Sequence, residues 1–181
     1  DNGVDDDGDG VVDDTQEDPA GSPEVDFNGD FNLVEYRLTG TDLNNYALGI
    51  RAEDDRAYVR FDPDPNTTVT GRFEAVSPEA LQEYGIEPAN TRWLHLAGVF
   101  DGQQLKLYIN GILKTTLNVS VEAATGPGEL TLGRDLVGDL EEVRVWSVAR
   151  TGDEISDSYR WLLMFHPDKP AGSLTGRLSS T

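Results

Sequence analysis

Two short dipeptides divide the middle of the chain and restrict what it can fold into. Asp101-Gly102 and Asn110-Gly111 suit the positive φ angles of tight hairpin turns, and each lies between apolar segments. Residues 105–109 alternate between the two turns as a strand with one buried face does. The side chains expected on that buried face are those of Leu105, Leu107 and Ile109. The sequence therefore predicts two consecutive antiparallel hairpins.

Further short strands are expected on both sides of these hairpins. After residue 90 the predicted strands are 93–100, 105–109, 112–119, 129–132 and 142–146. Before residue 90 we expect strands at 45–50, 56–61 and 69–76, and alternation in the second of them puts Ala57, Val59 and Phe61 on one face. Two short helices are expected at residues 77–84, with Ser77 as N-cap, and at residues 151–164, with Thr151 as N-cap. Many short strands between turns predict an all-β antiparallel β-sandwich or jelly roll, with one or two peripheral helices.

Several ordered motifs in this region resemble those of one family. They are WLHLAGVFDG at 93–102, LYING at 107–111, LTLG at 130–133, GDLEEVRVW at 138–146 and VARTGDEI at 148–155. Together they resemble the laminin G-like, concanavalin A-like lectin domains. The resemblance implies a concanavalin A-like sandwich over about residues 24–165, with Asp101 and Asp139 as candidate calcium ligands at its edge. Lectins, adhesion modules, spacers and some hydrolases share this fold, so the fold does not decide the function.

The composition excludes several classes of function. The 181 residues include 34 acidic and 14 basic side chains, for a net charge of −20, and residues 1–30 hold 12 of the acids and no Lys or Arg. Such a surface repels phosphate backbones, so we expect no nucleic-acid partner. The chain contains no run of eighteen apolar residues, so no membrane insertion is expected. It has no cysteines, which excludes disulfides and thiolate metal sites.

The first eighteen residues, DNGVDDDGDGVVDDTQED, have the spacing of a calcium loop. Acids stand at positions 1, 3, 5 and 9, Gly10 at position 6 allows a sharp turn, and Gln16 occupies position 12, where an EF-hand has glutamate. The segment more closely resembles the acidic repeats of thrombospondin type 3. The predicted Ca²⁺ ligands are Asp5, Asp7, Asp9, the carbonyl of Val11, Asp13 and Glu17. The alternative interpretation is a solvated acidic linker.

Residues 25–38 allow two interpretations. A weaker second calcium site would use Asp26, Asn28, Asp30 and Glu35. However, Phe31 stands where calcium-loop geometry needs a glycine, because a positive φ at Phe31 would be strained. The other interpretation is a strand pair around a turn at Asn28-Gly29, with the side chains of 31, 33 and 35 opposite those of 32, 34 and 36. We favour the strand pair.

Few residues suit catalysis. His95 and His166 are the two histidines of the chain, and His95 lies in a predicted strand, where a structural role is expected. A glycosidase needs two carboxylates about 5 to 9.5 Å apart, and Asp139, Glu141 and Glu142 come nearest to that requirement in the sequence. We therefore expect no enzyme. The three tryptophans are Trp93, Trp146 and Trp161, which are expected in the core, or on sugar rings if exposed.

The chain is thus expected to comprise an acidic calcium-binding repeat and linker at 1–23, a laminin G/concanavalin A-like sandwich at 24–165 and a linker at 166–181. We expect a non-catalytic, extracellular or cell-surface module that binds a glycan or another surface protein. Copies of the chain itself are a further candidate partner. It would be one part of a larger secreted or cell-surface protein. The alternatives are a spacer in a surface stalk or filament, and an accessory domain of a secreted polysaccharide hydrolase.

Overall fold

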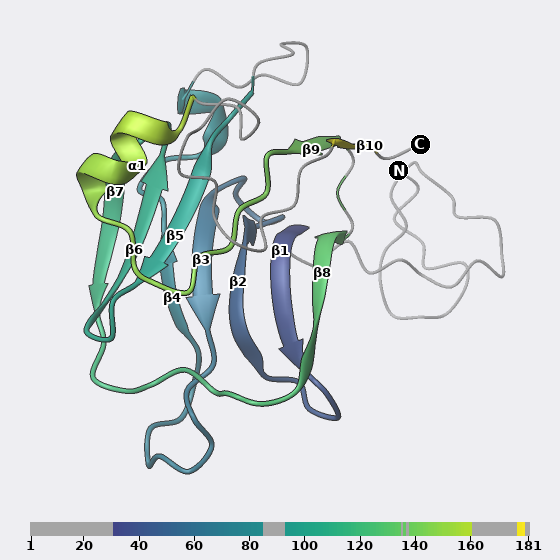
Figure 1. Cartoon of the computed structure of the whole chain (residues 1–181), viewed down its shortest axis with the longest axis vertical. Coiled ribbons are helices and arrows are strands. Elements are labelled where there is room, and N and C mark those ends of the chain that lie inside the picture. Colours follow the sequence, from purple (N-terminus) through teal and green to yellow (C-terminus); the bar gives the residue numbers. More distant parts are fainter. Residues whose placement is uncertain (1–30, 85–92, 135, 137, 161–176, 180–181) are drawn as a thin grey trace, which may run out of the picture.

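Two antiparallel sheets face each other in a computed structural model that describes residues 31–84, 93–134, 136, 138–160 and 177–179 (Figure 1). Among these residues, the first sheet has the strand order β4 (Phe73–Val76), β3 (Ala57–Phe61), β2 (Asn44–Ile50), β1 (Phe31–Leu38) and β8 (Gly128–Arg134). The second sheet has the order β5 (Leu96–Phe100), β6 (Gln104–Ile109) and β7 (Ile112–Asn118). Outside the two sheets are the β9 (Asp139–Glu141) and β10 (Arg177–Ser179) pair, the 3-10 helix η1 (Leu81–Tyr84) and α1 (Gly152–Ser158). The predicted all-β sandwich is confirmed.

Both predicted hairpins form at the predicted dipeptides. Gly102 has a φ of +90°, and Asn110 and Gly111 have φ values of +50° and +77°. The carboxylate of Asp101 accepts a hydrogen bond from the backbone N–H of Gln104 at 2.7 Å, which closes the first turn. These local interactions fix the register of the β5-β6-β7 sheet and therefore which side chains point inward.

The core lies between β3 and β6. The alternation predicted for both strands is confirmed, because alternate side chains of each strand are at most 5% exposed. These inward side chains are Ala57, Val59 and Phe61 from β3 and Leu105, Leu107 and Ile109 from β6. The ring of Phe61 also lies 4.8 Å, between centroids, from Phe100 of β5, so aromatic contact joins the two sheets directly.

The three-stranded sheet covers only part of the five-stranded one. Strands β5, β6 and β7 pack against β2, β3 and β4, while β1 and β8 extend beyond this contact (Figure 1). In the described part of the chain, the inner face of β1 and of part of β2 therefore has no strand of the smaller sheet packed against it. Residues 142–150 cover part of this face, because they cross between the two sheets before entering α1 (Figure 1).

The strand predicted at 142–146 is not formed. Strand β9 ends at Glu141, and Glu142 has a φ of +56°, in the left-handed region that breaks an extended chain. Residues 142–146 instead have no regular secondary structure. Neither sheet pairs with this segment among the described residues, because the larger sheet ends at β4 and β8 and the smaller sheet at β5 and β7.

Strand β1 contains a bulge that the predicted alternation missed. Its pairing register with β2 shifts between Asn32 and Val34. As a result Asn32 and Glu35 lie on one face of the sheet, beside Tyr58 and Arg60 of β3, rather than on opposite faces. The predicted strand at 31–36 is otherwise confirmed, and its expected partner at 25–27 lies outside the described residues.

The helical predictions were right at one N-cap and wrong at the other. Thr151 caps α1 in a capping box with Glu154, although α1 ends at Ser158 rather than at residue 164. Ser77 does not cap a helix, because its Oγ accepts a hydrogen bond from Ala57 and donates one to the carbonyl of Glu79. Helix η1 begins only at Leu81, and β4 begins at residue 73 rather than 69.

A glycine at the sheet-to-sheet contact allows a first prediction. A Cβ atom added at Gly98 would lie 2.3 Å from Cγ2 of Val59, which no real contact tolerates. We expect Gly98→Ala to lower the free energy of unfolding by about 1–3 kcal/mol, because overpacking forces the sheets apart. Urea denaturation measures this loss.

The matched control for that substitution is Gly126→Ala. A Cβ atom there would lie 3.9 Å from Leu38, an ordinary contact, and Gly126 has no positive φ. Equal stabilities of the two variants would show that β5 does not approach β3 as closely as the structure indicates.

Candidate functional site

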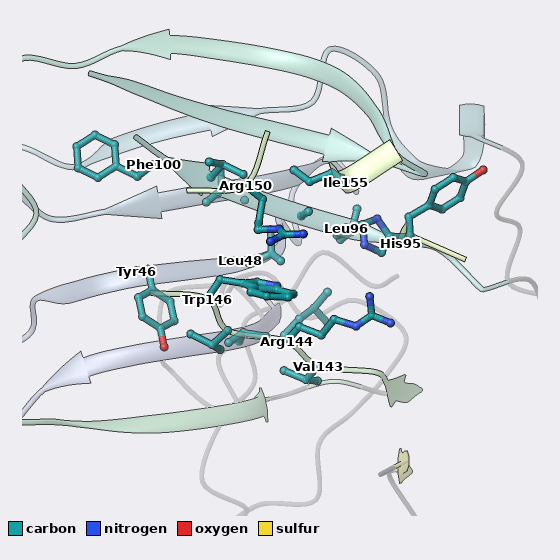
Figure 2. A pocket seen from close by; sticks show the side chains of 18 of the residues that line it. Tyr46, Leu48, His95, Leu96, Phe100, Val143, Arg144, Trp146, Arg150 and Ile155 are labelled. Carbon is teal, nitrogen blue, oxygen red and sulfur yellow. The ribbon is translucent and has the colours of Figure 1, made fainter. Parts of the chain in front are cut away.

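A cavity of about 940 Å³ lies between the two sheets, where the smaller sheet leaves the larger one uncovered. Its walls come from the inner faces of β1, β2 and β5, from residues 140–150 and from the end of α1 (Figure 2). Its volume is in the range of sites that hold small ligands. The cavity reaches solvent, because Trp93 and Val148 in its wall are 56% and 64% exposed.

The centre of the cavity is built around Trp146. The guanidinium carbon of Arg150 lies 4.2 Å from the centre of the Trp146 ring, within the range of a cation–π contact (Figure 2). Nη1 of Arg150 is 3.2 Å from Oε1 of Glu154, and Oε2 of Glu154 accepts a hydrogen bond of 2.8 Å from the backbone N–H of Thr151. The first turn of α1 therefore holds Arg150 over the indole.

Aromatic side chains line the walls of the cavity on several sides. Tyr46 of β2 and Phe100 of β5 face it from the two sheets (Figure 2). Tyr46 also stacks on Tyr36, with ring centroids 5.8 Å apart. Flat apolar faces beside polar groups suit the binding of sugar rings and of other amphipathic ligands.

His95 forms the wall beside α1 and stays neutral at pH 7. Burial and the nearby charge of Arg144 lower its pKa from 6.5 to about 4. Its ring lies 5.7 Å from that of Tyr159, and Nδ1 is buried with no hydrogen-bond partner among the described residues. Its backbone N–H donates to Oδ1 of Asn110, so the second hairpin turn positions it. The expected structural role agrees with this placement.

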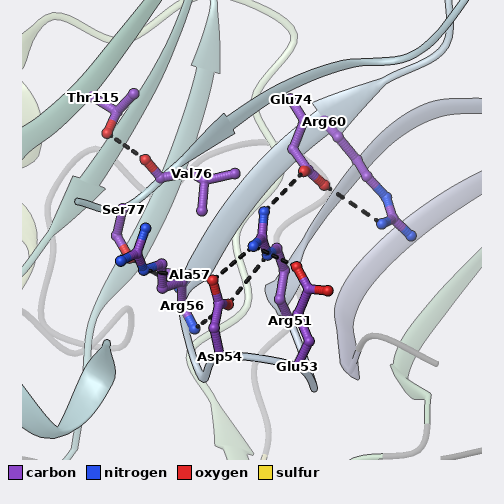
Figure 3. A network of polar contacts seen from close by, with 10 residues as sticks. All are labelled: Arg51, Glu53, Asp54, Arg56, Ala57, Arg60, Glu74, Val76, Ser77 and Thr115. Atoms are coloured by element: carbon purple, nitrogen blue, oxygen red, sulfur yellow. Dashed lines mark hydrogen bonds and ion pairs between the residues drawn. The ribbon is translucent and has the colours of Figure 1, made fainter. Parts of the chain in front are cut away.

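A second polar cluster lies at the β2–β3 turn. The side chain of Arg51 reaches Glu53 at 2.5 Å, Asp54 at 2.6 Å and Glu74 at 3.8 Å, and Arg60 reaches Glu74 at 3.6 Å (Figure 3). These ion pairs connect β2, β3 and β4 on the face of the sheet that is turned away from the core. Each charge is matched by another side chain of this chain, so the cluster stabilises the sheet.

The residues of the predicted calcium loop lie outside the described part of the chain. This applies to Asp5, Asp7, Asp9, Val11, Asp13 and Glu17, and to Asp26, Asn28 and Asp30 of the weaker second candidate. Glu35 of that candidate lies in β1, is 3% exposed, and has its Oε2 at 3.4 Å from Nε of Arg134. Both calcium sites stay predictions, as do the domain boundaries at residues 23 and 165.

No metal site forms among the acids and histidines that the structure describes, since no three of them lie close enough to share an ion. The carboxylate of Asp101 lies 2.7 Å from Nζ of Lys106 and accepts hydrogen bonds from the backbone N–H groups of the turn. These contacts lower the pKa of Asp101 to about 2. Asp139 lies in β9, and Glu142 pairs with Arg144 at 3.4 Å. In the same described residues, no helix is long and apolar enough to cross a bilayer.

The sequence did not predict the cavity or its arginines. The core position expected for Trp93 is wrong, because Trp93 is 56% exposed. Trp93 and Trp146 both line the cavity, and Trp161 lies outside the described residues. The two-residue spacing of Arg144 and Trp146 would place them on one side of a strand, but residues 142–146 have no regular secondary structure. No local sequence pattern predicts that Arg150 lies over the Trp146 ring, because that contact depends on where α1 begins.

Three comparisons relate this chain to known proteins. Residues 35–156 match the family model Laminin_G_3, described as the concanavalin A-like lectin/glucanases superfamily. Pappalysin-1 of Mus musculus and of Homo sapiens are each 34% identical to this chain over an alignment of 74 positions, which covers 35% of this chain. The matches span 5% and 4% of those two proteins. A crystal structure of an S-layer domain-containing protein (residues 221–444) from Clostridium thermocellum ATCC 27405 aligns over 81% of this chain and 71% of that one, at 18% identity and a TM-score of 0.30.

The buried His95 predicts a dependence of stability on pH. Its pKa is about 4 in the folded chain and near 6.5 when unfolded, so the unfolded state binds more protons between these values. We expect the free energy of unfolding to fall as the pH drops from 6.5 to 5, and His95→Gln to remove this part of the dependence. Urea denaturation at a series of pH values measures it.

His166 provides a matched control, because it is the second histidine of the chain. We expect His166→Gln to keep the pH dependence of the unmodified chain between pH 6.5 and 5. If His95→Gln keeps it as well, then His95 is not buried as a neutral ring.

Proposed function

This chain belongs to the concanavalin A-like lectin/glucanases superfamily, and we propose that it is a non-catalytic, extracellular, calcium-stabilised module that recognises glycans or another surface protein. The observation that carries the proposal is the cavity of about 940 Å³ between the sheets, with aromatic walls and an opening to solvent beside Trp93. Such a cavity can stack the apolar faces of sugar rings and bind their hydroxyl groups with polar side chains at the edges.

The carboxylates near the cavity favour binding over hydrolysis. A glycosidase places two carboxyl groups on either side of the bond it cleaves. Among the described residues, the cavity wall holds Glu141 and Glu142, which are neighbours in the chain, and Glu142 pairs with Arg144. Two adjacent carboxylates on one wall do not enclose a sugar between them. We therefore propose recognition without catalysis.

Calcium enters the proposal through the sequence of residues 1–18. Four aspartates at calcium-loop spacing lie in a segment without one Lys or Arg to neutralise them. We propose that Ca²⁺ bound there converts a repelling acidic tether into a stiff arm that positions the sandwich. A calcium-dependent arm is in keeping with a protein that works outside the cell, and on this basis we place the chain at the cell surface or in a secreted protein.

Calcium binding is tested on the full chain by calorimetry and thermal unfolding. A ligand at a hundred times its Kd adds about 2.7 kcal/mol of stability to the structure it binds, or roughly 5–10 °C for a chain of this size. We expect the double variant Asp7→Asn, Asp9→Asn to lose most of the calcium heat, since it removes two of the predicted ligands.

The control for this double variant is Asp157→Asn, an exposed acid in α1. It should bind calcium as the unmodified chain does. If the two variants and the unmodified chain all give the same heat, or none gives any, then residues 1–18 are a solvated linker.

Glycan recognition is tested by measuring binding to a broad panel of oligosaccharides. We expect Trp93→Ala to weaken the affinity for a bound glycan by roughly 2–10-fold, because it removes an exposed aromatic surface at the cavity opening. Ile112→Ala is the control, since Ile112 is 61% exposed on β7 and does not line the cavity.

Two outcomes would contradict the proposal. If the chain binds no glycan and no surface protein, a spacer in a stalk is the better description. If it cleaves a bound glycan, and Glu141→Gln or Glu142→Gln abolishes the cleavage, the chain is a hydrolase.

A further inference from the structure

Positive charge gathers in the cavity of a strongly acidic protein. The whole chain has 14 basic and 34 acidic residues. The residues that line the cavity nevertheless include three arginines on its side of the sheets, Arg144, Arg150 and Arg160, and two acids, Glu141 and Glu142. The side chain of Arg60, a further lining residue, points to the outer face of the larger sheet and pairs there with Glu74. Arginines outnumber acids in this wall, whereas acids outnumber bases in the whole chain, so the wall attracts anions more than the rest of the surface does.

We propose that the cavity selects sugars that carry a carboxylate, with Arg150 as the residue that binds the carboxylate and Trp146 as the surface that holds Arg150 in place. The inference rests on the proposed glycan-binding function and names the class of glycan. It assigns a specificity-determining role to an arginine that the sequence did not single out.

The geometry of Arg150 suits a planar anion. Its guanidinium lies over the indole of Trp146 at 4.2 Å, and this contact fixes the orientation of a flexible side chain. Nη1 of Arg150 lies 3.2 Å from Oε1 of Glu154, and this contact is the ion pair that Arg150 forms within the described residues. A guanidinium has five N–H donors in a fork that matches the two oxygens of a carboxylate, so donors stay available for a ligand. The side chain is 25% exposed, so a ligand in the cavity can reach it.

The surroundings of Arg150 strengthen such a contact. The pKa of His95 in the same wall is lowered first by burial and then by the charge of Arg144, so this histidine stays neutral beside the arginines. Arg144 itself is 14% exposed and is held by the carbonyl of Ser158 at 3.3 Å. Arg160 lies at the exposed edge, with its guanidinium 5.0 Å from the ring of Tyr159. Charges in partly buried sites are screened less by salt than those on the open surface.

Sugar rings suit the cavity better than other carriers of a carboxylate. The walls combine this positive charge with the aromatic side chains of Tyr46, Phe100 and Trp93, which offer flat apolar surfaces. An acidic peptide brings charge without rings to stack, and a long polyanion meets the acidic outer surface before it reaches the cavity. A short oligosaccharide with uronate units presents both the ring and the carboxylate.

The test is calorimetry of the full chain, in calcium, with hexasaccharides of hyaluronan, galacturonate and mannuronate. Each is compared with its carboxyl methyl ester, which keeps the ring and removes the charge. Neutral cellohexaose, a heparin-derived hexasaccharide and hexaglutamate complete the set of probes. We expect at least one uronate hexasaccharide to bind, and its methyl ester to bind at least about tenfold more weakly, because a charge-assisted hydrogen bond is lost.

Arginine variants then locate the site. Arg150→Gln should weaken uronate binding by about tenfold and Arg160→Gln by less, with no change for a bound neutral sugar. Arg37→Gln is the matched control, because Arg37 lies in β1 outside the cavity wall and pairs with the exposed Asp42. Thermal unfolding of each variant shows whether it is folded, and the exposed Arg160 provides a second variant if Arg150→Gln is not.

Distinct outcomes separate this inference from the function on which it rests. Equal binding of a uronate hexasaccharide and its methyl ester, or of cellohexaose, would overturn the inference and leave glycan recognition standing. Tighter binding of the heparin fragment or of hexaglutamate would show a general anion site and overturn it as well. If no uronate probe binds while the broad panel gives a glycan ligand, the inference fails alone. If the broad panel also gives none, glycan recognition fails with it.

Discussion

The contact between β3 and β6 is the interaction on which the rest of this molecule depends. The inward side chains of β3 pack against those of β6 and are buried there. The absence of a side chain at Gly98 lets β5 approach β3. Hydrophobic burial of this kind is the dominant favourable term in folding. It also fixes the distance between the sheets, and thus the width of the space that remains beside the contact.

That remaining space exists because the two sheets are unequal. Five strands face three, so the inner surface of β1 and β2 extends beyond its cover. The chain covers this surface partly with residues 142–150, which lack the backbone pairing of a strand. The cavity lies where this irregular segment meets the uncovered inner faces of the two sheets. Its position thus follows from the mismatch between the sheets, and the segment contributes Arg144, Trp146 and Arg150 to its wall.

The sequence was sufficient for features that depend on neighbouring residues. The turns at Asp101-Gly102 and Asn110-Gly111, the inward faces of β3 and β6, and the capping box of Thr151 are local, and all are confirmed. The sequence was insufficient for features that depend on contacts between residues far apart in the chain. The left-handed conformation of Glu142, the bulge in β1 and the stacking of Arg150 on Trp146 depend on tertiary packing. The calcium loop remains a sequence pattern, because its residues lie outside the described part of the chain.

The side chain of Glu154 makes two structural contacts. One carboxylate oxygen caps the first turn of α1 through Thr151, and the other pairs with Arg150 above the indole. Aspartate would shorten the reach to both partners, and glutamine would keep an acceptor for the cap while giving up the charge. Aspartate at this position would therefore disturb the start of the helix and the ion pair of Arg150 together. Glutamine would separate the two contacts, because the helix would keep its cap while the guanidinium of Arg150 lost its carboxylate partner and became more available to a ligand.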